Sequence, residues 1–388
     1  MKKIIPYGSQ YIDKSDIKDV STALSKDIIT SGATTLKFEK KISEYLNCRY
    51  AVTSNSGTSA IFIALHALNL KKGDKIIMPA INFIASYNAA KLLGAKIYLA
   101  DVDQYTGQMR PEDVEDCCKK FGIKNFNVLI VMYNGGYPQN AEKFKSLKKK
   151  YNCFIVEDAC HALGATYRYK KIYYKVGSCK HSDICTFSLH PLKTITTGEG
   201  GITTTNNKIL FEKMKLIRSL GIKRFSNKHW EYNVVLKGLN FRLTDFQSAL
   251  GLSQLKKINK FILKRKKISL KYDKEIKKIK QIVLPKLNNN YRSSYHLFII
   301  HLQKKNKKLK EKLIKFMLKN RVMLQYHYIP IYKFKIFEGK YINKNAEIYY
   351  NSAVSLPVYY SLSQSNQILI IRLLNKFFKN IPKKIKYL

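Results

Sequence analysis

The stretch 127–158 reads NVLIVMYNGGYPQNAEKFKSLKKKYNCFIVED, and its pattern indicates the fold of the first two thirds of the chain. It begins and ends with short runs rich in β-branched residues, 127–133 and 153–158, and an amphipathic helical stretch, 140–151, separates them. A strand, a helix and a second strand in this order are typical of a parallel sheet covered by helices. The alternation continues on both sides, with strands expected at 75–79, 96–101 and 184–189 and helices at 58–70 and 111–121. We therefore expect an α/β fold with a large, mainly parallel sheet between helices, and ligand-binding residues just after each strand.

The last third of the chain has a different pattern. A strongly amphipathic helix is expected at 243–258, and after it the segments QIVLP, YHLFIIHL and VMLQYHYIP are predicted to be strands. Helices are expected at 306–319 and 364–379. We therefore predict a large domain at 1–250 and a smaller C-terminal α+β domain at 251–388.

The charge balance is strongly basic. The 388 residues include 71 Lys and Arg against 26 Asp and Glu, which gives a formal net charge of +45. Such an excess raises the question of a nucleic-acid partner, but the densest region, 256–319, has no zinc-finger spacing and no aromatic pattern of an RNA-binding domain. Lysine that is abundant throughout the chain and covers the solvated face explains the same composition, so we expect no specific nucleic-acid partner.

Cysteine usage and hydropathy bear on location. The seven cysteines form no CxxC pair, which argues against a disulfide framework or a zinc site and for a reducing compartment. No apolar run approaches the ~18 residues of a membrane span. We therefore expect a cytoplasmic protein without a membrane segment and without a metal.

Three short segments carry candidate chemistry, and the first is SNSGTSAIFIALHAL, 54–68. Small hydroxyl residues and a glycine lead directly into an apolar helix, so hydroxyls and free backbone N–H groups converge on the positive end of that helix. This arrangement suits a phosphate. An ordinary helix N-cap explains the same residues.

The second segment is FIVEDACHALGA, 154–165. An apolar strand ends at Glu157 and Asp158, and His161 follows three residues later. A carboxylate at the end of a strand can hold a proton on a heterocyclic nitrogen, and the imidazole can orient that carboxylate or the ring. The competing interpretation is that Asp158 caps a short following helix.

The third segment is SLHPLKTITTGEGG, 188–201. Lys193 has no formally charged residue within five positions on either side, apart from a protonated His190. A lysine in surroundings that disfavour its ammonium has a lowered pKa, and its neutral amine can attack an aldehyde to form an imine. A lysine that extends from a loop to solvent is the alternative. A phosphate cradle, a carboxylate for a ring nitrogen and an imine-forming lysine at successive strand ends are together the parts that bind pyridoxal 5′-phosphate.

These segments, with several others, resemble the sugar aminotransferases of the DegT/DnrJ/EryC1/StrS family, which are fold-type I enzymes that depend on pyridoxal phosphate. The likeness covers nearly the whole chain. It is carried by IPYGSQYID (5–13), NSGTSA (55–60), VEDACHALGA (156–165), VGSCKHSDICTFSLHPLKTITTGEGG (176–201), RSLGI (218–222), LNFRLTDFQSALGLSQLKKI (239–258) and YHYIPIY (326–332).

The resemblance implies roles for individual residues. Lys193 forms the imine with the cofactor, Asp158 pairs with its pyridine nitrogen, and His161 lies near its hydroxyl group. Phe83 stacks on the cofactor ring. The phosphate is held by Thr58, Ser59 and Ser188, and Asn240 reaches the phosphate of the neighbouring subunit's cofactor, which implies a homodimer. Candidates for binding the nucleotide-sugar are Tyr7, Thr30, Arg242, His327 and Tyr328, although Tyr7 and Tyr328 are equally well explained as packing residues.

The opening segment, DQYTGQMRPEDVE (103–115) and the 176–201 block narrow the resemblance to enzymes of pseudaminic acid biosynthesis. It implies transfer of the amino group of L-glutamate to C4 of a UDP-linked 4-keto-6-deoxy-N-acetylhexosamine, for a surface glycan. Asn82 stands where the family usually has Thr, and 28–33 and 131–136 also depart from its pattern, so another nucleotide-linked keto sugar, of the perosamine or 3-amino type, stays open. A related sugar dehydratase with His in place of the lysine is disfavoured by Lys193, and a non-catalytic relative that only binds the cofactor is the remaining alternative.

Overall fold

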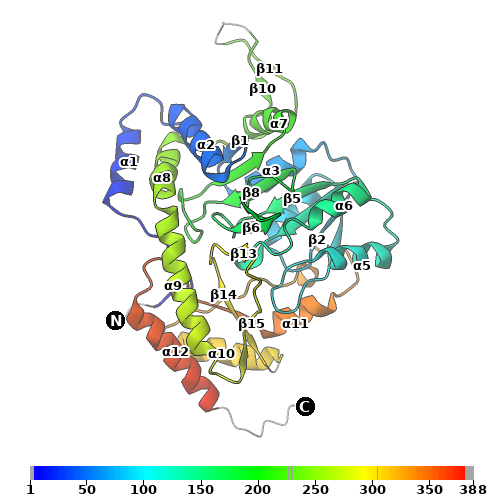
Figure 1. Cartoon of the computed structure of the whole chain (residues 1–388). Coiled ribbons are helices and arrows are strands. Elements are labelled where there is room, and N and C mark those ends of the chain that lie inside the picture. The colour runs from blue at the N-terminus through cyan, green and yellow to red at the C-terminus, as the bar shows by residue number, and fades with distance from the viewer. Residues whose placement is uncertain (1–3, 226–227, 229, 304, 381–388) are drawn as a thin grey trace.

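The computed structural model describes residues 4–225, 228, 230–303 and 305–380. A large sheet with its helices occupies one part of the molecule, and a smaller sheet with α10 and α12 occupies the other (Figure 1). The long helix α9 runs from one part to the other. No helix in the described ranges is both long and apolar enough to cross a membrane.

The large sheet has seven strands in the order β1-β9-β8-β5-β4-β2-β3. All of them run in one direction except β9, which is antiparallel to both β8 and β1. Every residue of β4 and of β9 is buried, so both faces of the sheet are covered. The strands are β1 (Tyr50–Ser54), β2 (Lys75–Pro79), β3 (Lys96–Ala100), β4 (Val128–Met132), β5 (Phe154–Asp158), β8 (Ile184–Ser188) and β9 (Gly201–Thr205). The predicted α/β class is confirmed, and each of the five predicted strands of this part is present.

The helices of this part follow the chain between the strands. Helix α5 begins at Pro111, where the missing N–H of proline costs nothing, and ends at Gly122, which adopts a left-handed conformation. Helix α6 begins at Phe144 rather than at 140, because Asn140 has a φ of 60°, which a right-handed helix does not accommodate. The helices are α1 (Lys14–Leu24), α2 (Ala33–Leu46), α3 (Gly57–Ala67), α4 (Ile84–Leu92), α5 (Pro111–Phe121), α6 (Phe144–Tyr151), α7 (Lys208–Arg218) and α8 (Asp245–Lys256).

The C-terminal part has its own three-stranded sheet, in the order β12-β14-β15, and its own cluster of buried apolar side chains. Its elements are α9 (Ile258–Ile276), β12 (Ile282–Val283), β14 (Phe298–Leu302), α10 (Lys307–Lys319), α11 (Lys344–Ser352), β15 (Ala353–Leu356) and α12 (Gln364–Lys379). The strand predicted at 322–330 was wrong, because this segment makes only single bridges, from Val322 to Ile5 and from Gln325 to Ser355. The division of the chain at 250/251 stays a prediction.

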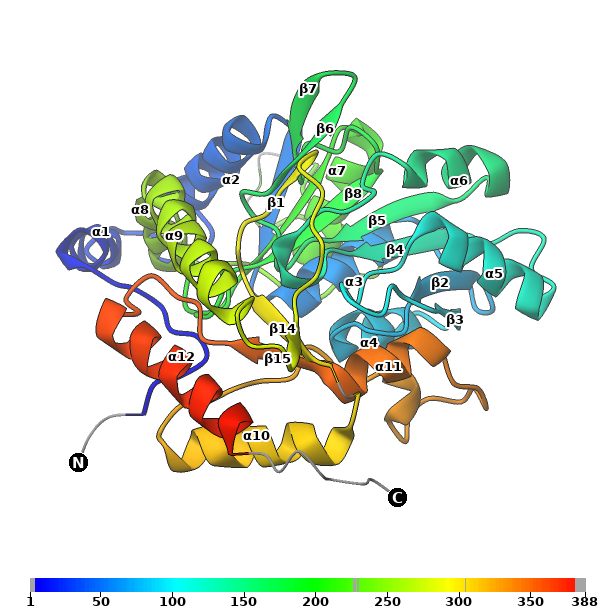
Figure 2. The same cartoon turned by 60° about the horizontal axis from the view of Figure 1, so that its bottom comes forward.

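Two smaller pairings complete the fold. Strands β6 (Thr166–Tyr169), β7 (Ile172–Lys175) and β13 (Tyr291–Arg292) form a separate three-stranded sheet. Strands β10 (Ile222–Lys223) and β11 (Asn233–Val234) form a hairpin that projects from the body beyond α7 (Figure 1). Several large apolar side chains of this hairpin and the segment after it are exposed, among them Phe225, Tyr232, Val234, Val235 and Leu239. Figure 2 shows β14, β15, α10 and α12 on the side of the molecule away from α7.

Candidate active site

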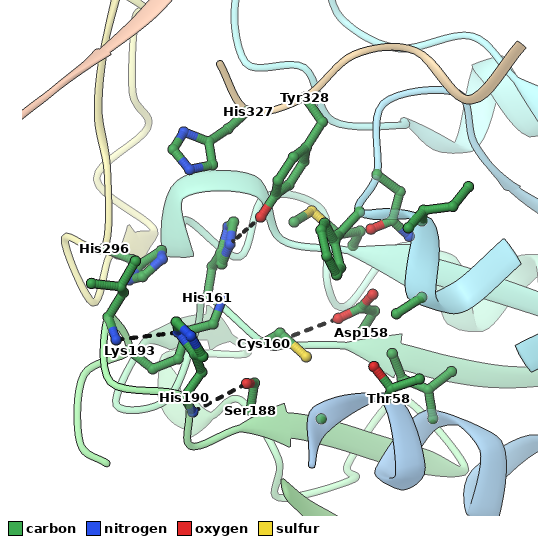
Figure 3. A pocket seen from close by; sticks show the side chains of 18 of the residues that line it. Thr58, Asp158, Cys160, His161, Ser188, His190, Lys193, His296, His327 and Tyr328 are labelled. Atoms are coloured by element: carbon green, nitrogen blue, oxygen red, sulfur yellow. Dashed lines mark hydrogen bonds between the residues drawn. The ribbon is translucent and has the colours of Figure 1, made fainter. Parts of the chain in front are cut away.

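A cavity of about 590 Å³ lies at the carboxyl ends of the parallel strands. Residues just after β1, β2, β5 and β8 line it, and residues 325–329 of the C-terminal part close it from the other side. Parallel strands bring their carboxyl ends to one edge of a sheet, where α/β proteins bind their ligands. Figure 3 shows that Thr58, Asp158, His161 and Lys193, which are far apart in the sequence, surround this single space.

One end of the cavity is formed by the N-terminus of α3. The side chain of Ser56 accepts a hydrogen bond from the backbone N–H of Ser59, so it is the N-cap of the helix. The N–H groups of Gly57 and Thr58 belong to the first turn, where a helix offers no acceptors of its own. Thr58 lines the cavity, whereas the hydroxyl of Ser59 donates to Asn55 Oδ1 at 2.6 Å and does not line it. The N-cap interpretation is therefore confirmed, whereas phosphate binding by this turn stays a prediction, with Ser56, Gly57 and Thr58 lining the cavity.

Asp158 is the last residue of β5 and is 3% exposed. Its Oδ2 accepts a hydrogen bond from the hydroxyl of Ser86 at 2.7 Å, and its Oδ1 accepts one from the backbone N–H of Cys160 at 3.3 Å. No helix follows, because residues 159–164 form turns before β6 begins. The interpretation of Asp158 as a helix cap was therefore wrong. The carboxylate lies in the wall of the cavity, as Figure 3 shows.

Lys193 lies on the connection between β8 and β9 and lines the cavity. Its side chain is partly exposed, and burial by the surrounding protein lowers its pKa below the usual 10.5. Asp158 opposes this shift. The thiol of Cys160 has a pKa raised well above its ordinary value by burial, so it stays neutral and adds no charge near the lysine. The alternative of a lysine that extends into solvent was wrong.

Three histidines and a tyrosine form one cluster beside the lysine (Figure 3). Burial holds the pKa of His161 well below its usual value, so the ring is neutral. The N–H of Gly135 donates to Nδ1 of His161 at 3.3 Å, which makes Nδ1 the unprotonated nitrogen. Nε2 of His161 therefore carries the proton and donates to the hydroxyl of Tyr328 at 2.8 Å. It follows that the hydroxyl proton of Tyr328 is left for an acceptor other than His161.

The other two histidines extend this cluster. The rings of His161 and His296 are 4.2 Å apart, and burial also lowers the pKa of His296 well below its usual value. Nδ1 of His327 is 2.9 Å from Ser355 Oγ, and burial lowers the pKa of His327 to about 3. All three rings are therefore neutral at physiological pH, and they line the cavity.

Phe83 also lines the cavity, next to Tyr328, and its side chain is unusually exposed for an aromatic residue. It is 54% exposed and lies directly before α4, and its ring centre is 5.7 Å from that of Tyr328. An exposed ring at the mouth of a cavity can stack on a flat ligand. Tyr7 also lines the cavity, 5.7 Å from the ring of His327.

Besides Ser59, three of the predicted residues do not line the cavity. Thr30 and Asn240 are exposed, and Arg242 is half-buried. They lie in one region, because the backbone N–H of Asp245 donates to Thr30 O at 2.9 Å, and that of Asn55 donates to the O of Phe241 at 2.8 Å. This region lies beside the N-terminus of α3, on the surface of the subunit.

The sequence analysis missed residues that the fold brings to the cavity. His296 lines it from the C-terminal part, and its buried Nδ1 has no hydrogen-bond partner among the described residues. The carboxamide of Asn82 likewise has both polar atoms buried and unpaired in that part of the chain. Ser86, which donates to Asp158, could have been suspected from sequence only because it lies on the helix that directly follows Phe83.

The residues of the cavity fit pyridoxal 5′-phosphate. A Cβ added to Gly57 would lie 2.7 Å from Cβ of Ser188, so the first turn of α3 and the end of β8 approach closely and leave a narrow cradle rich in donors. A buried carboxylate and a lysine with a lowered pKa lie along the same cavity. Phosphate, ring nitrogen and aldehyde of the cofactor each have a chemically matched group there.

Comparison with known proteins gives the same class of enzyme. Residues 10–375 match the model of the DegT/DnrJ/EryC1/StrS aminotransferase family. The chain is 35% identical over 364 residues to a UDP-4-amino-4,6-dideoxy-N-acetyl-beta-L-altrosamine transaminase of Campylobacter jejuni, covering 93% of this chain and 94% of that one. It is 30% identical to the GDP-perosamine synthase of Escherichia coli O157:H7, covering 97% of this chain and 100% of that one. Among solved structures, PseC of Helicobacter pylori, an aminotransferase of pseudaminic acid biosynthesis, has a TM-score of 0.88 at 31% identity and covers 98% of this chain and 100% of its own.

Proposed function

We propose a function that follows from the family of the chain, because it belongs to the DegT/DnrJ/EryC1/StrS aminotransferase family. In this proposal, it transfers the amino group of L-glutamate to C4 of a UDP-linked 4-keto-6-deoxy-N-acetylhexosamine. The product is a precursor of a pseudaminic acid-type surface glycan. The enzyme class is established: the protein is a pyridoxal phosphate-dependent aminotransferase of nucleotide-linked sugars. The observation that carries the proposal for the site is the position of Lys193 in the cavity that also contains Asp158 and the N-terminus of α3.

In this proposal, Thr58 and Ser188 hold the phosphate with the free N–H groups of α3, and Ser59 contributes through the same turn. Asp158 holds the proton of the ring nitrogen, and its orientation is fixed by Ser86. When bound, the cofactor supplies an aldehyde for the amine of Lys193 and a ring that withdraws electrons from the carbon being deprotonated. Phe83 covers one face of that ring.

Lys193 is the group that moves protons. Its lowered pKa leaves a larger fraction of the amine neutral at physiological pH than at a surface lysine, so Nζ can take the proton from Cα of L-glutamate. In the second half of the reaction the same Nζ delivers a proton, so that the amino group is left on C4 of the sugar. His161 stays neutral throughout and orients Tyr328, whose hydroxyl proton is available to a substrate oxygen.

The choice of sugar is supported by the similarity to the Campylobacter transaminase and to PseC. Tyr7, His327 and Tyr328 line the cavity and are the candidate contacts to the nucleotide-sugar within one subunit. The second candidate function is amination of a GDP-linked keto sugar, which the similarity to the perosamine synthase favours.

We place Thr30, Asn240 and Arg242 at the active site of a second copy of the chain, in a homodimer. Two observations support this assignment. The three residues gather on the surface outside the cavity of their own subunit, and the neighbouring hairpin β10–β11 exposes several large apolar side chains. An exposed apolar patch of this kind is typical of a protein interface. A cytoplasmic location stays a prediction.

The test is a direct comparison of keto sugars. Purified enzyme is supplied with L-glutamate and with either the UDP-linked 4-keto-6-deoxy-N-acetylhexosamine or GDP-linked 4-keto-6-deoxymannose, and the aminated sugar is measured by mass spectrometry. We expect kcat/KM to be at least about 100-fold higher for the UDP-sugar, because a site built around one base and one acetamido group leaves polar atoms unpaired with the other. A preference for the GDP-sugar would establish the second candidate, and turnover of neither would contradict both sugar assignments and leave the 3-amino type as the candidate.

A further inference from the structure

Arg265, on α9, is a buried cation that contacts the Lys193 loop, the connection between β8 and β9. It is 3% exposed, and no Asp or Glu pairs with it in the part of the chain that the structure describes. Burial lowers its pKa from 12.5 to about 10, so the guanidinium stays charged at neutral pH. An unpaired charge in a protein interior is costly and is rarely retained without a use.

The contacts of Arg265 are all with backbone carbonyls. Nη1 donates to Val358 O at 2.8 Å and to His296 O at 3.3 Å, and Nη2 donates to the O of Leu192 and of Lys193 at 3.5 Å each. These carbonyls belong to two segments that line the cavity and to a third in the C-terminal part. The carbonyls pair with Nη1 and Nη2, whereas the buried Nε has no hydrogen-bond partner among the described residues. Neutral carbonyls do not cancel the charge, so the field of the guanidinium extends to the groups nearby.

The titratable groups around Lys193 form an unbalanced set. They are Asp158 at the end of β5, Cys160 and His161 directly after that strand, and His296, His327 and Arg265 from the C-terminal part. Cys160 is a neutral thiol and the three histidines are neutral. Burial is the main cause that lowers the pKa of Lys193, and the effects of Asp158 and Arg265 are smaller. Glu199 also lines the cavity. Asp158 favours the ammonium form of Lys193, and Arg265 disfavours it.

We propose that Arg265 is a positioning residue that holds the backbone of the Lys193 loop through the carbonyls of Leu192 and Lys193, and that its charge acts on the amine of Lys193 in addition to burial. It counteracts Asp158, which the site requires for another purpose and which by itself would favour a protonated, inert lysine. Arg265 thereby connects the Lys193 loop and the segment of His296 to α9. This inference rests on the proposed role of Lys193 but not on the identity of the sugar.

The experiment measures the amine itself. The full-length protein, freed of cofactor, is acylated with acetic anhydride between pH 6.5 and 10, and the labelling rate of Lys193 is compared by mass spectrometry with that of exposed Lys266 on the same helix. In the wild type, we expect Lys193 to titrate below Lys266. In Arg265→Gln, which keeps a donor but removes the charge, we expect Lys193 to be labelled roughly tenfold more slowly at pH 7, the effect of a pKa that rises by about one unit.

Two variants separate charge from hydrogen bonding. Arg265→Lys keeps the charge and loses the fork of donors, and it should label Lys193 within about twofold of the wild-type rate. Lys267→Gln removes a neighbouring exposed charge and keeps the reference Lys266, and it should change nothing, because water screens it. If the labelling rate of Lys193 falls equally in Arg265→Gln and Arg265→Lys, the arginine acts only through its hydrogen bonds, and the proposed effect of its charge is overturned. If Arg265→Gln does not fold, the wild type decides: a Lys193 that titrates with Lys266 also overturns it. No sugar is present, so a wrong sugar assignment leaves this result untouched.

Discussion

Lys193 and Lys310 are both enclosed by protein, but they lie in regions that use a lysine differently. Lys310, on α10, is 1% exposed and makes no ion pair among the described residues. Its Nζ donates to the carbonyl of Tyr350 and lies 4.1 Å from the ring centres of both Tyr326 and Tyr350. Burial lowers its pKa to about 7.

In both regions burial lowers the pKa of the lysine, but only one of the two lysines lines a cavity that a ligand can enter. Lys310 is enclosed between two aromatic rings at the C-terminal end of α11, where the rings and the last carbonyls of the helix offset only part of the cost of burying its cation. Lys193 lines a cavity that also contains the carboxylate of Asp158 and the N-terminus of α3. A lowered pKa therefore does not identify a catalytic lysine by itself, and access to a cavity with complementary groups is the deciding feature.

The largest expected difference between the two regions is in activity. Lys193→Ala should lower amino transfer by at least about 1,000-fold, because it removes both the nucleophile and the group that moves protons. Lys310→Met should stay within about threefold of the wild type. The measurement is the rate of aminated sugar formation, with the visible absorbance of bound cofactor as a second readout. Near-normal turnover in Lys193→Ala would remove the distinction between the two lysines.

A smaller effect is expected on stability, and it concerns Lys310. Its pKa is about 7 in the folded protein and near 10.5 when unfolded, so between these values the unfolded chain binds more protons. The free energy of unfolding of the wild type should therefore rise relative to that of Lys310→Met as pH increases from 7, by about 1–2 kcal/mol up to pH 8.5. Denaturant unfolding at several pH values measures it, with exposed Lys312→Met as the control. A difference that does not change with pH would contradict the sealed, titrating lysine.

The smallest effect separates two tyrosines of one segment. Tyr328 accepts a hydrogen bond from His161 in the cavity, whereas Tyr326 contributes its ring to Lys310. Tyr328→Phe should lower kcat/KM for the keto sugar about 5- to 10-fold, the value of one hydrogen bond in a buried site. Tyr326→Phe keeps the aromatic ring and should change it less than twofold. Equal kinetics of the two variants would assign Tyr328 to packing.

The parts of the site that sequence reasoning located are those attached to strand ends. Asp158 and Lys193 follow apolar runs whose burial on both faces is visible in composition, and Gly57 precedes an unmistakable apolar helix. His296 and Arg265 could not be located in this way, because their roles depend on how the C-terminal part packs over the cavity. The segment 322–330 was predicted to be a strand, but it is held by single backbone bridges and by side-chain contacts such as that of His327 with Ser355 rather than by a ladder. Sequence pattern reports local burial, and these contacts are long-range.

Strand β1 is the edge of the large sheet and pairs with β9, although the two are far apart along the chain. The strands β2 and β3, in contrast, are neighbours both in sequence and in the sheet. During synthesis on the ribosome, β2 and β3 can therefore pair early, whereas the strand that precedes the phosphate cradle must wait until Thr205 has emerged. The turn that we propose to hold the cofactor's phosphate is one of the first segments made and one of the last to be fixed in place. A nascent chain interrupted before β9 would consequently lack the binding site as a whole, and the cell gains no partly active fragment from it.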